Sequence, residues 1–213
     1  MALPAVLAAV VLVAGCTAET PEPPVVSACP TAPPTETAVV TPERLCEIDG
    51  RAWRASSFTF VLSVPEWRGL TPECDVARQD AYWTAWKATQ PAIVTLDLAS
   101  GFDEDSGDLG SVGVAVIDDE NATATVASID AELDACVTEA SGQTRIDHGE
   151  WHGFRGPTSE EGDVRSTWWV AFGDSWALVQ ARSSNGATDA EVDEFDAALP
   201  TLLDAQLDLL EGP

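Results

Sequence analysis

The chain has 213 residues, of which 10 are Lys or Arg and 36 are Asp or Glu, so its formal net charge at pH 7 is −26. A surface with this charge repels phosphate, which excludes nucleic acid as a partner and disfavours close contact with anionic lipid head groups. The length beyond a Pro-rich N-terminal part fits one ordinary domain.

Residues 2–14 form an almost wholly apolar, uncharged run. The run has the length of a signal-peptide core and is shorter than the roughly 20 apolar residues that span a bilayer. It ends at Val13-Ala14-Gly15-Cys16, where small residues precede a thiol. These four residues resemble the bacterial lipobox. The resemblance implies that residues 1–15 are a signal peptide and that Cys16 is acylated and becomes the new N-terminus.

A lipid on Cys16 would place the protein on the extracytoplasmic face of the cell membrane, with the bilayer as one partner. Two ester-linked acyl chains of the palmitate type and an amide-linked third anchor a protein stably, where one chain does not. No Lys or Arg precedes the apolar core, although signal peptides normally carry positive charge there. Two explanations stay open, an atypical signal or a true start upstream of Met1. The alternatives to an anchor are an ordinary secretory signal with a chance cysteine, and a buried N-terminal helix.

Residues 16–42 are predicted to be the lipid anchor and a disordered tether. Residues 17–42 contain seven of the 14 prolines and no aromatic or basic residue. Such a segment buries too little apolar surface to offset its ordering entropy, and its prolines favour extended polyproline II.

Four cysteines follow Cys16, and an even number outside the cytoplasm suggests two disulfides. Their spacing contains no C-x-x-C and matches no zinc pattern. Four cysteines allow three connectivities. From proximity along the chain we predict the pairs Cys29–Cys46 and Cys74–Cys136.

Two kinds of periodicity divide residues 43–213, which we predict to form a single domain. Apolar residues that alternate or run on over short segments predict strands, and the strongest pair is joined through Gly173-Asp174, a typical hairpin turn. The predicted strands are 57–64, 93–98, 112–117, 143–148, 151–154, 165–172 and 175–182.

Apolar residues at three-four spacing predict three helices, at 76–88, at 121–141 and from Thr188 onward. Thr188 with Glu191 has the pattern of a capping box, and Pro200 is expected to interrupt the last helix. Few strands alternate one-for-one with helices. We therefore predict an α+β fold with a largely antiparallel sheet on which helices pack.

The segment Phe58–Trp67, an apolar strand followed by a Val-Pro step and a Trp, looks like the opening of Mog1/PsbP-like domains. The hairpin Trp168–Gln180, the polar turn 183–186 and the helix from Thr188 look like their end. Actinobacterial surface lipoproteins and the extracellular sensor domains of some receptor kinases share this layout. The resemblance implies an α-β-α sandwich with a binding or scaffolding role. It implies no particular ligand, because fold does not fix function.

One candidate for catalysis is Ser175. Phe172-Gly173-Asp174-Ser175 resembles the nucleophile block of the GDSL esterases. Those enzymes also need a His base near the C-terminus, and no His follows His152. A Ser without a positioned base is a weak nucleophile, and a hairpin turn explains the same four residues.

A candidate metal site is formed by His148 and His152. Together with Glu150 they alternate, so on one strand they would project from the same face and could hold Zn²⁺ or Cu²⁺. Gly149 and Gly153 favour a turn-rich segment with surface histidines instead.

Eight tryptophans are many for one domain. Adjacent Trp168 and Trp169 must face opposite sides of their strand. Most tryptophans are expected in the core, but some could line a ligand cleft. The candidate cleft residues are Trp67, Trp83, Trp86, Trp151 and Trp168.

The leading hypothesis is a non-enzymatic cell-envelope lipoprotein, without a cofactor, whose acidic domain binds or scaffolds a protein or small ligand. A sensor-like ligand-binding domain is the first alternative. A hydrolase that uses Ser175 and a metal-binding lipoprotein that uses His148 and His152 are the others.

Overall fold

The computed structural model describes residues 29, 38–56, 92–103, 105–136, 143–157 and 164–212. The predicted strand 57–64 and helix 76–88 lie outside these residues, as do the predicted tryptophans of segment 67–86. Cys16 and Cys74 also lie outside, so lipidation and the pairing Cys74–Cys136 stay predictions.

Seven strands of the described residues form one sheet, in which every neighbouring pair is antiparallel. The strand order is β1-β2-β3-β7-β6-β5-β4. Together with the helices this confirms the predicted α+β class. The strands are β1 (Ala52–Ala55), β2 (Ala92–Ala99), β3 (Asp108–Asp118), β4 (Thr144–His148), β5 (Trp151–Pro157), β6 (Val164–Phe172) and β7 (Ser175–Ser183).

Two tight hairpins build one half of the sheet. Phe172 pairs with Ser175 across the turn that joins β6 and β7, as the sequence predicts. His148 pairs with Trp151 across the turn that joins β4 and β5. The first residue of each turn, Gly173 or Gly149, has φ of 56°, the left-handed region that glycine enters without strain.

The described helices are α1 (Pro42–Asp49), α3 (Ala122–Cys136), α4 (Asp189–Asp196) and α5 (Leu199–Glu211). The predicted capping box is present, because Thr188 N–H donates to Glu191 Oε2 at 2.7 Å and the Glu191 N–H donates to Thr188 Oγ1 at 3.4 Å. The predicted interruption is present as well, since α5 starts anew with Pro200 in its first turn. The sequence predicted neither α1 nor β1.

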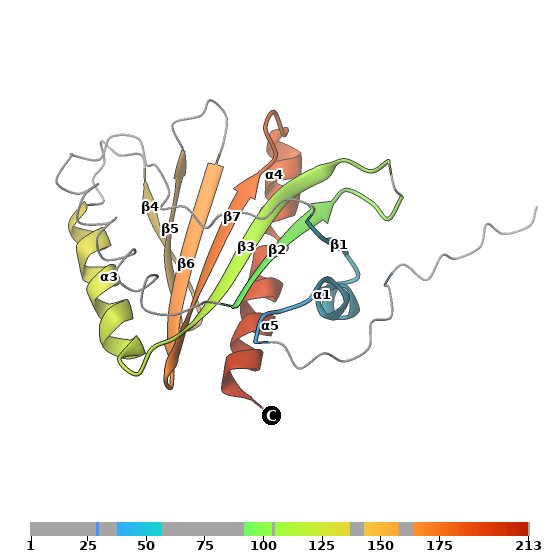
Figure 1. Ribbon diagram of the computed structural model, residues 1–213. Coiled ribbons are helices and arrows are strands. Elements are labelled where there is room, and N and C mark those ends of the chain that lie inside the picture. Colours follow the sequence, from blue (N-terminus) through green and yellow to red (C-terminus); the bar gives the residue numbers. More distant parts are fainter. Residues whose placement is uncertain are drawn as a thin grey trace, which may run out of the picture.

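The sheet carries helices on both faces, as Figure 1 shows with α3 on one side and α1, α4 and α5 on the other. Side chains alternate along each strand, and residues paired across antiparallel strands share a face. The face under α1, α4 and α5, here called the α5 face, holds the main core cluster. Its buried members include Leu96, Val112, Val114, Trp168, Val179, Leu199 and Leu202.

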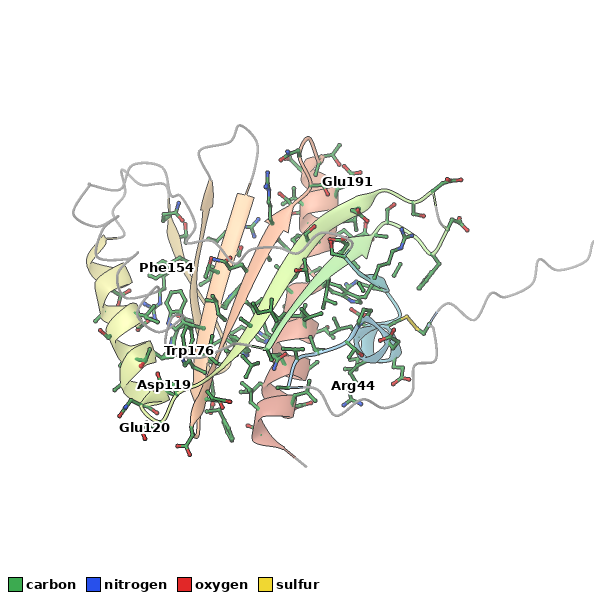
Figure 2. The ribbon with its side chains drawn as sticks, in the orientation of Figure 1. Arg44, Asp119, Glu120, Phe154, Trp176 and Glu191 are labelled. Carbon is green, nitrogen blue, oxygen red and sulfur yellow. A yellow bond between two sulfur atoms is a disulfide. The ribbon has the colours of Figure 1, made fainter. Side chains whose placement is uncertain are left out.

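The opposite face, here called the α3 face, is apolar beneath the helix. Val126 and Ile129 of α3 are buried, as their three-four spacing predicts, and Ala122 is buried beside them. They cover a layer in which the rings of Phe154 and Trp169 lie 5.7 Å apart. Figure 2 shows Phe154 between α3 and the sheet. Burial of these groups on one sheet face fixes the strand register, because a one-residue slip would turn them to the other face.

The chain before α1 packs on α5. Thr41 caps α1 by accepting from the Arg44 N–H, and Val40 is fully buried. These residues fall within the range 16–42 that the sequence assigns to the tether. The predicted disulfide Cys29–Cys46 is present and fastens residue 29 to α1 (Figure 2). Over the described part of the chain, no helix has the length and apolarity needed to cross a membrane.

Candidate functional site

A hollow of about 310 Å³, here called the polar pocket, opens where the C-terminal ends of β1 and β7 meet the N-terminal end of β3. Its walls come from these strands, from β2 and from the turn after β7, and every lining side chain is polar. The lining residues are Ser56, Thr95, Asp97, Asp108, Ser111, Arg182, Ser183, Ser184 and Asn185.

The register of three strands produces the floor of the polar pocket. Asp97 of β2 pairs with Ser111 of β3, and Ser111 pairs with Arg182 of β7. The three side chains therefore form a row on the α3 face, with neighbours about 5 Å apart. Ser111 Oγ donates to Asp97 Oδ1 at 2.6 Å, which fixes one carboxylate oxygen against the floor.

Hydrogen bonds also hold the rim. Ser184 Oγ donates to the backbone carbonyl of Asp108, and the Ser184 N–H donates to the Leu109 carbonyl at 2.9 Å. Arg182 Nη2 donates to Asn185 Oδ1 at 3.0 Å. The turn after β7 is thereby tied both to β3 and to the Arg182 guanidinium. The pocket is thus a preformed feature of the sheet end.

Negative charge dominates the polar pocket. Burial and the neighbouring Asp97 carboxylate raise the pKa of Asp108 above its ordinary value, and the Arg54 guanidinium acts against them. Arg54 itself donates to the carbonyls of Gly101 and Asp103, at 3.1 and 2.6 Å. It therefore stabilises the neighbouring 101–103 loop. The lining of the polar pocket contains two carboxylates and one guanidinium, that of Arg182.

A second hollow of about 170 Å³ lies on the α5 face between the β4–β6 strands and the start of α5. Arg155 and Asp196, which both line it, form an ion pair. His148, another lining residue, places Nε2 at 2.7 Å from Asp204 Oδ1. Burial raises the pKa of Asp196, although Arg155 lowers it. Trp168 and Leu203 also line this hollow. Because side chains already pair across it, this hollow offers a ligand less than the polar pocket does.

His148 and His152 do not share a face, in agreement with the turn-rich segment that Gly149 and Gly153 favour. Residues 149–150 form a turn, so the two histidines stand on different strands. His148 pairs with Trp151 and points to the α5 face, whereas His152 pairs with Asp147 and points to the α3 face. His152 Nδ1 lies 3.1 Å from Asp147 Oδ1. Among the described side chains, no three His, Cys, Asp or Glu residues gather as a metal-binding group.

Ser175 begins β7 at the end of the hairpin, away from both histidines. Its Oγ donates to Asp118 Oδ1 at 3.2 Å. His152 pairs with Trp169, and Trp169 pairs with Leu178 of β7. His152 is therefore two strands away from β7, at the level of Leu178, which is three residues beyond Ser175. Three residues of strand are about 10 Å, which is beyond hydrogen-bond reach. Neither histidine is thus placed as a base for Ser175.

The described tryptophans fill the interior. Trp151 is fully buried and donates from Nε1 to the Leu203 carbonyl at 3.1 Å. Trp168 faces α5 and Trp169 faces α3, and both are buried. Gly153 makes room for Trp168, since a Cβ there would lie 2.8 Å from the ring. Trp151 and Trp168 are therefore core residues, and Trp168 also lines the second hollow.

No motif in the sequence predicted the polar pocket. Its one local signal is Thr95 and Asp97 alternating with Leu96 and Leu98, which marks the end of β2 as having a polar face. The other walls come from residues far away in the sequence. Only the strand order brings them together.

No protein-family model and no curated protein matches the chain. Two solved structures are similar to parts of it. The extracellular domain of PknH from Mycobacterium tuberculosis matches with 12% identity over 80% of this chain and 94% of that one, at a TM-score of 0.45. A structure from Bacteroides thetaiotaomicron VPI-5482 matches with 15% identity over 48% and 37%, at a TM-score of 0.30. At these values neither assigns the chain to a family, and the lipobox and Mog1/PsbP resemblances stay predictions.

Proposed function

We propose that the chain is a lipid-anchored protein of the cell envelope whose extracytoplasmic domain binds a small polar molecule in the polar pocket without transforming it. The observation that carries this proposal is the pocket itself. It has a volume of about 310 Å³ and an all-polar lining that hydrogen bonds hold in place. Ligand sites are largely preformed hollows in which convergent polar groups fix the orientation of the ligand, and the polar pocket supplies such groups.

The chemistry of the lining favours binding over catalysis. The pair in the lining that most resembles a nucleophile with its base is Ser111 and Asp97, because the Ser111 hydroxyl donates to the Asp97 carboxylate. A carboxylate is too weak a base to take a proton from an alcohol near neutral pH, so this pair is suited to accept hydrogen bonds and to attract positive charge. A sensor-like role, in which ligand binding is reported to another protein, uses the same site.

The anchor rests on the sequence and on one disulfide. Val13-Ala14-Gly15-Cys16 has the lipobox pattern, and Cys29–Cys46 is the kind of cross-link that persists in oxidising compartments outside the cytoplasm. Acylation of Cys16 is tested on the full chain in a bacterial host. We expect the wild type in the membrane fraction and an N-terminal peptide that starts at Cys16 with added diacylglyceryl mass. Cys16→Ser should lack that mass, and an unlipidated wild-type peptide would refute the anchor.

Ligand binding is tested with the full chain in mild detergent. The protein is incubated with a small-molecule extract of bacterial cells, washed and examined by native mass spectrometry. Ser111→Phe fills the polar pocket, and Ser175→Phe places the same side chain at the other end of the sheet as a control. We expect the wild type and Ser175→Phe to retain a small molecule that Ser111→Phe loses, with all three folded by circular dichroism. Retention by Ser111→Phe, or by none of the three proteins, contradicts the proposal.

A further inference from the structure

We propose that the ligand of the polar pocket carries an ammonium group, which the carboxylates of Asp97 and Asp108 hold; this inference rests on the proposed function. The proposal specifies the chemical class of the ligand. Three properties of the lining support it: the charge of the lining, the kinds of side chain that the lining lacks, and its hydrogen-bond acceptors.

Charge excludes anions from the polar pocket. Its lining holds the carboxylates of Asp97 and Asp108 and one guanidinium, that of Arg182. Arg182 donates to Asn185 at the rim. Arg54 is not part of the lining and directs its N–H groups to carbonyls of the 101–103 loop, although its charge also acts on Asp108. A phosphate or carboxylate ligand would be repelled by the two carboxylates of the lining, whereas a cation would be attracted to them.

The composition of the lining excludes two further classes. None of the nine lining residues is apolar or aromatic. A lipid or another apolar ligand would take water from the carboxylates of Asp97 and Asp108 without offering them a hydrogen-bond donor, which opposes its binding. A sugar would find no aromatic ring against which to stack its apolar face. A small and strongly hydrated ligand remains.

The acceptors of the lining fit the donors of an ammonium. An ammonium group has three N–H donors and no acceptor. Asp97 lines the pocket and accepts a hydrogen bond from Ser111 at one of its two oxygens, and Asp108 adds a second carboxylate. Burial and repulsion by Asp97 raise the pKa of Asp108, and a positive charge between the two carboxylates would counter that repulsion.

A divalent metal ion fits this lining less well. Ca²⁺ takes six to eight oxygen ligands and usually several carboxylates. The polar pocket offers two carboxylates, and the described residues contain no group of three acidic, His or Cys side chains. An ammonium group needs fewer ligands, because three acceptors satisfy its three N–H donors.

The test is isothermal titration of the full chain in mild detergent with five separate probes: putrescine, L-lysine, glucose, succinate and CaCl₂. We expect saturable heat with at least one of the two amines. Asp97→Asn and Asp108→Asn should each weaken that amine at least tenfold. Both substitutions keep the shape of the side chain, and in Asp97→Asn the amide oxygen can still accept from Ser111. Asp208→Asn, on the exposed side of α5, removes the same charge elsewhere and should leave the affinity unchanged.

The outcomes separate the ligand class from the proposed function. If glucose, succinate or Ca²⁺ binds, Ser111→Phe abolishes that binding and neither amine binds, the pocket is a binding site but the ammonium proposal is wrong. Amine binding that survives both Asp97→Asn and Asp108→Asn also overturns it. If no probe binds, the ammonium proposal fails, and the retention experiment with the cell extract decides the proposed function on its own.

Discussion

The backbone N–H of Val40 donates to Gln206 Oε1 at 3.0 Å, a hydrogen bond between residues that are 166 positions apart. The other end of the same amide, Gln206 Nε2, donates to the Ala38 carbonyl at 2.9 Å. Gln206 is fully buried on α5, so both ends of its amide need partners inside the protein. The last helix thus holds the segment that enters the domain.

Gln206→Leu is expected to destabilise the protein. Leucine has a similar size, but it leaves the buried Val40 N–H without its acceptor, which costs roughly 1–3 kcal/mol. Urea unfolding followed by circular dichroism measures the loss. Asp208→Asn, two residues further along α5 and exposed, serves as the control. Equal stability of the two variants would show that Gln206 does not hold the entering segment.

Arg145 is the link between β4 and α3. Its guanidinium lies 2.8 Å from Asp130 Oδ1, donates to Asp134 and lies 5.2 Å from the centre of the Phe154 ring. Since 29% of the Arg145 side chain is exposed, each ion pair contributes little alone, but one planar group makes all the contacts together.

We expect Arg145→Ala to cost about 1–2 kcal/mol, and Arg145→Lys to recover only part of this because an ammonium lacks the planar fork. Added salt should narrow the difference from the wild type. Arg44→Ala is the matched control, since Arg44 is exposed on α1 (Figure 2). A salt-independent loss, or full rescue by lysine, would argue against a guanidinium network.

The Cys29–Cys46 disulfide joins the N-terminal segment to a helix of eight residues. The cross-link spans 17 residues, a loop size for which the entropy model gives about 3 kcal/mol. Cys29→Ser should therefore lower the free energy of unfolding by roughly 2–4 kcal/mol. Reducing agent should bring the wild type to the same value. Unfolding curves of the variant and of the oxidised wild type that coincide would contradict this.

Local patterns in the sequence predicted much of the fold. The buried stripe of α3, the Gly173-Asp174 hairpin and the Thr188–Glu191 capping box each depend on residues close together in the chain. Such patterns are reliable because the residues that form the pattern also make the contacts. The break before α5 is equally local, since proline disrupts a helix interior whatever its tertiary surroundings.

The misses have one physical cause, contacts between distant segments. Helix α1 is short and gains its stability from the burial of Leu45 and from the disulfide. His148 and His152 could share a face only on one strand, and the turn at residues 149–150, which Gly149 indicates in the sequence, places them on different strands. The row Asp97, Ser111 and Arg182 requires the strand order β2-β3-β7, which no local pattern contains.

The raised pKa of Asp108 predicts how the stability of the protein depends on pH. Burial and Asp97 raise this pKa, while the Arg54 guanidinium lowers it and Arg182 lines the same pocket. A raised carboxyl pKa stabilises the fold at acid pH, and this contribution is lost as the pH rises through the folded-state pKa. Asp108→Asn should therefore gain stability relative to the wild type as the pH rises from acid to neutral.

The control for Asp108→Asn is Asp208→Asn. At a net charge of −26, any loss of negative charge lowers general repulsion at neutral pH, so only the excess effect of Asp108→Asn over Asp208→Asn belongs to the polar pocket. Melting temperatures of the three proteins, measured across the range in which carboxyl groups titrate, give this excess. A positive excess at neutral pH that disappears in acid supports strained paired carboxylates. An excess of zero, or one of the opposite sign, would show that the negative charge of Asp108 beside Asp97 does not destabilise the fold.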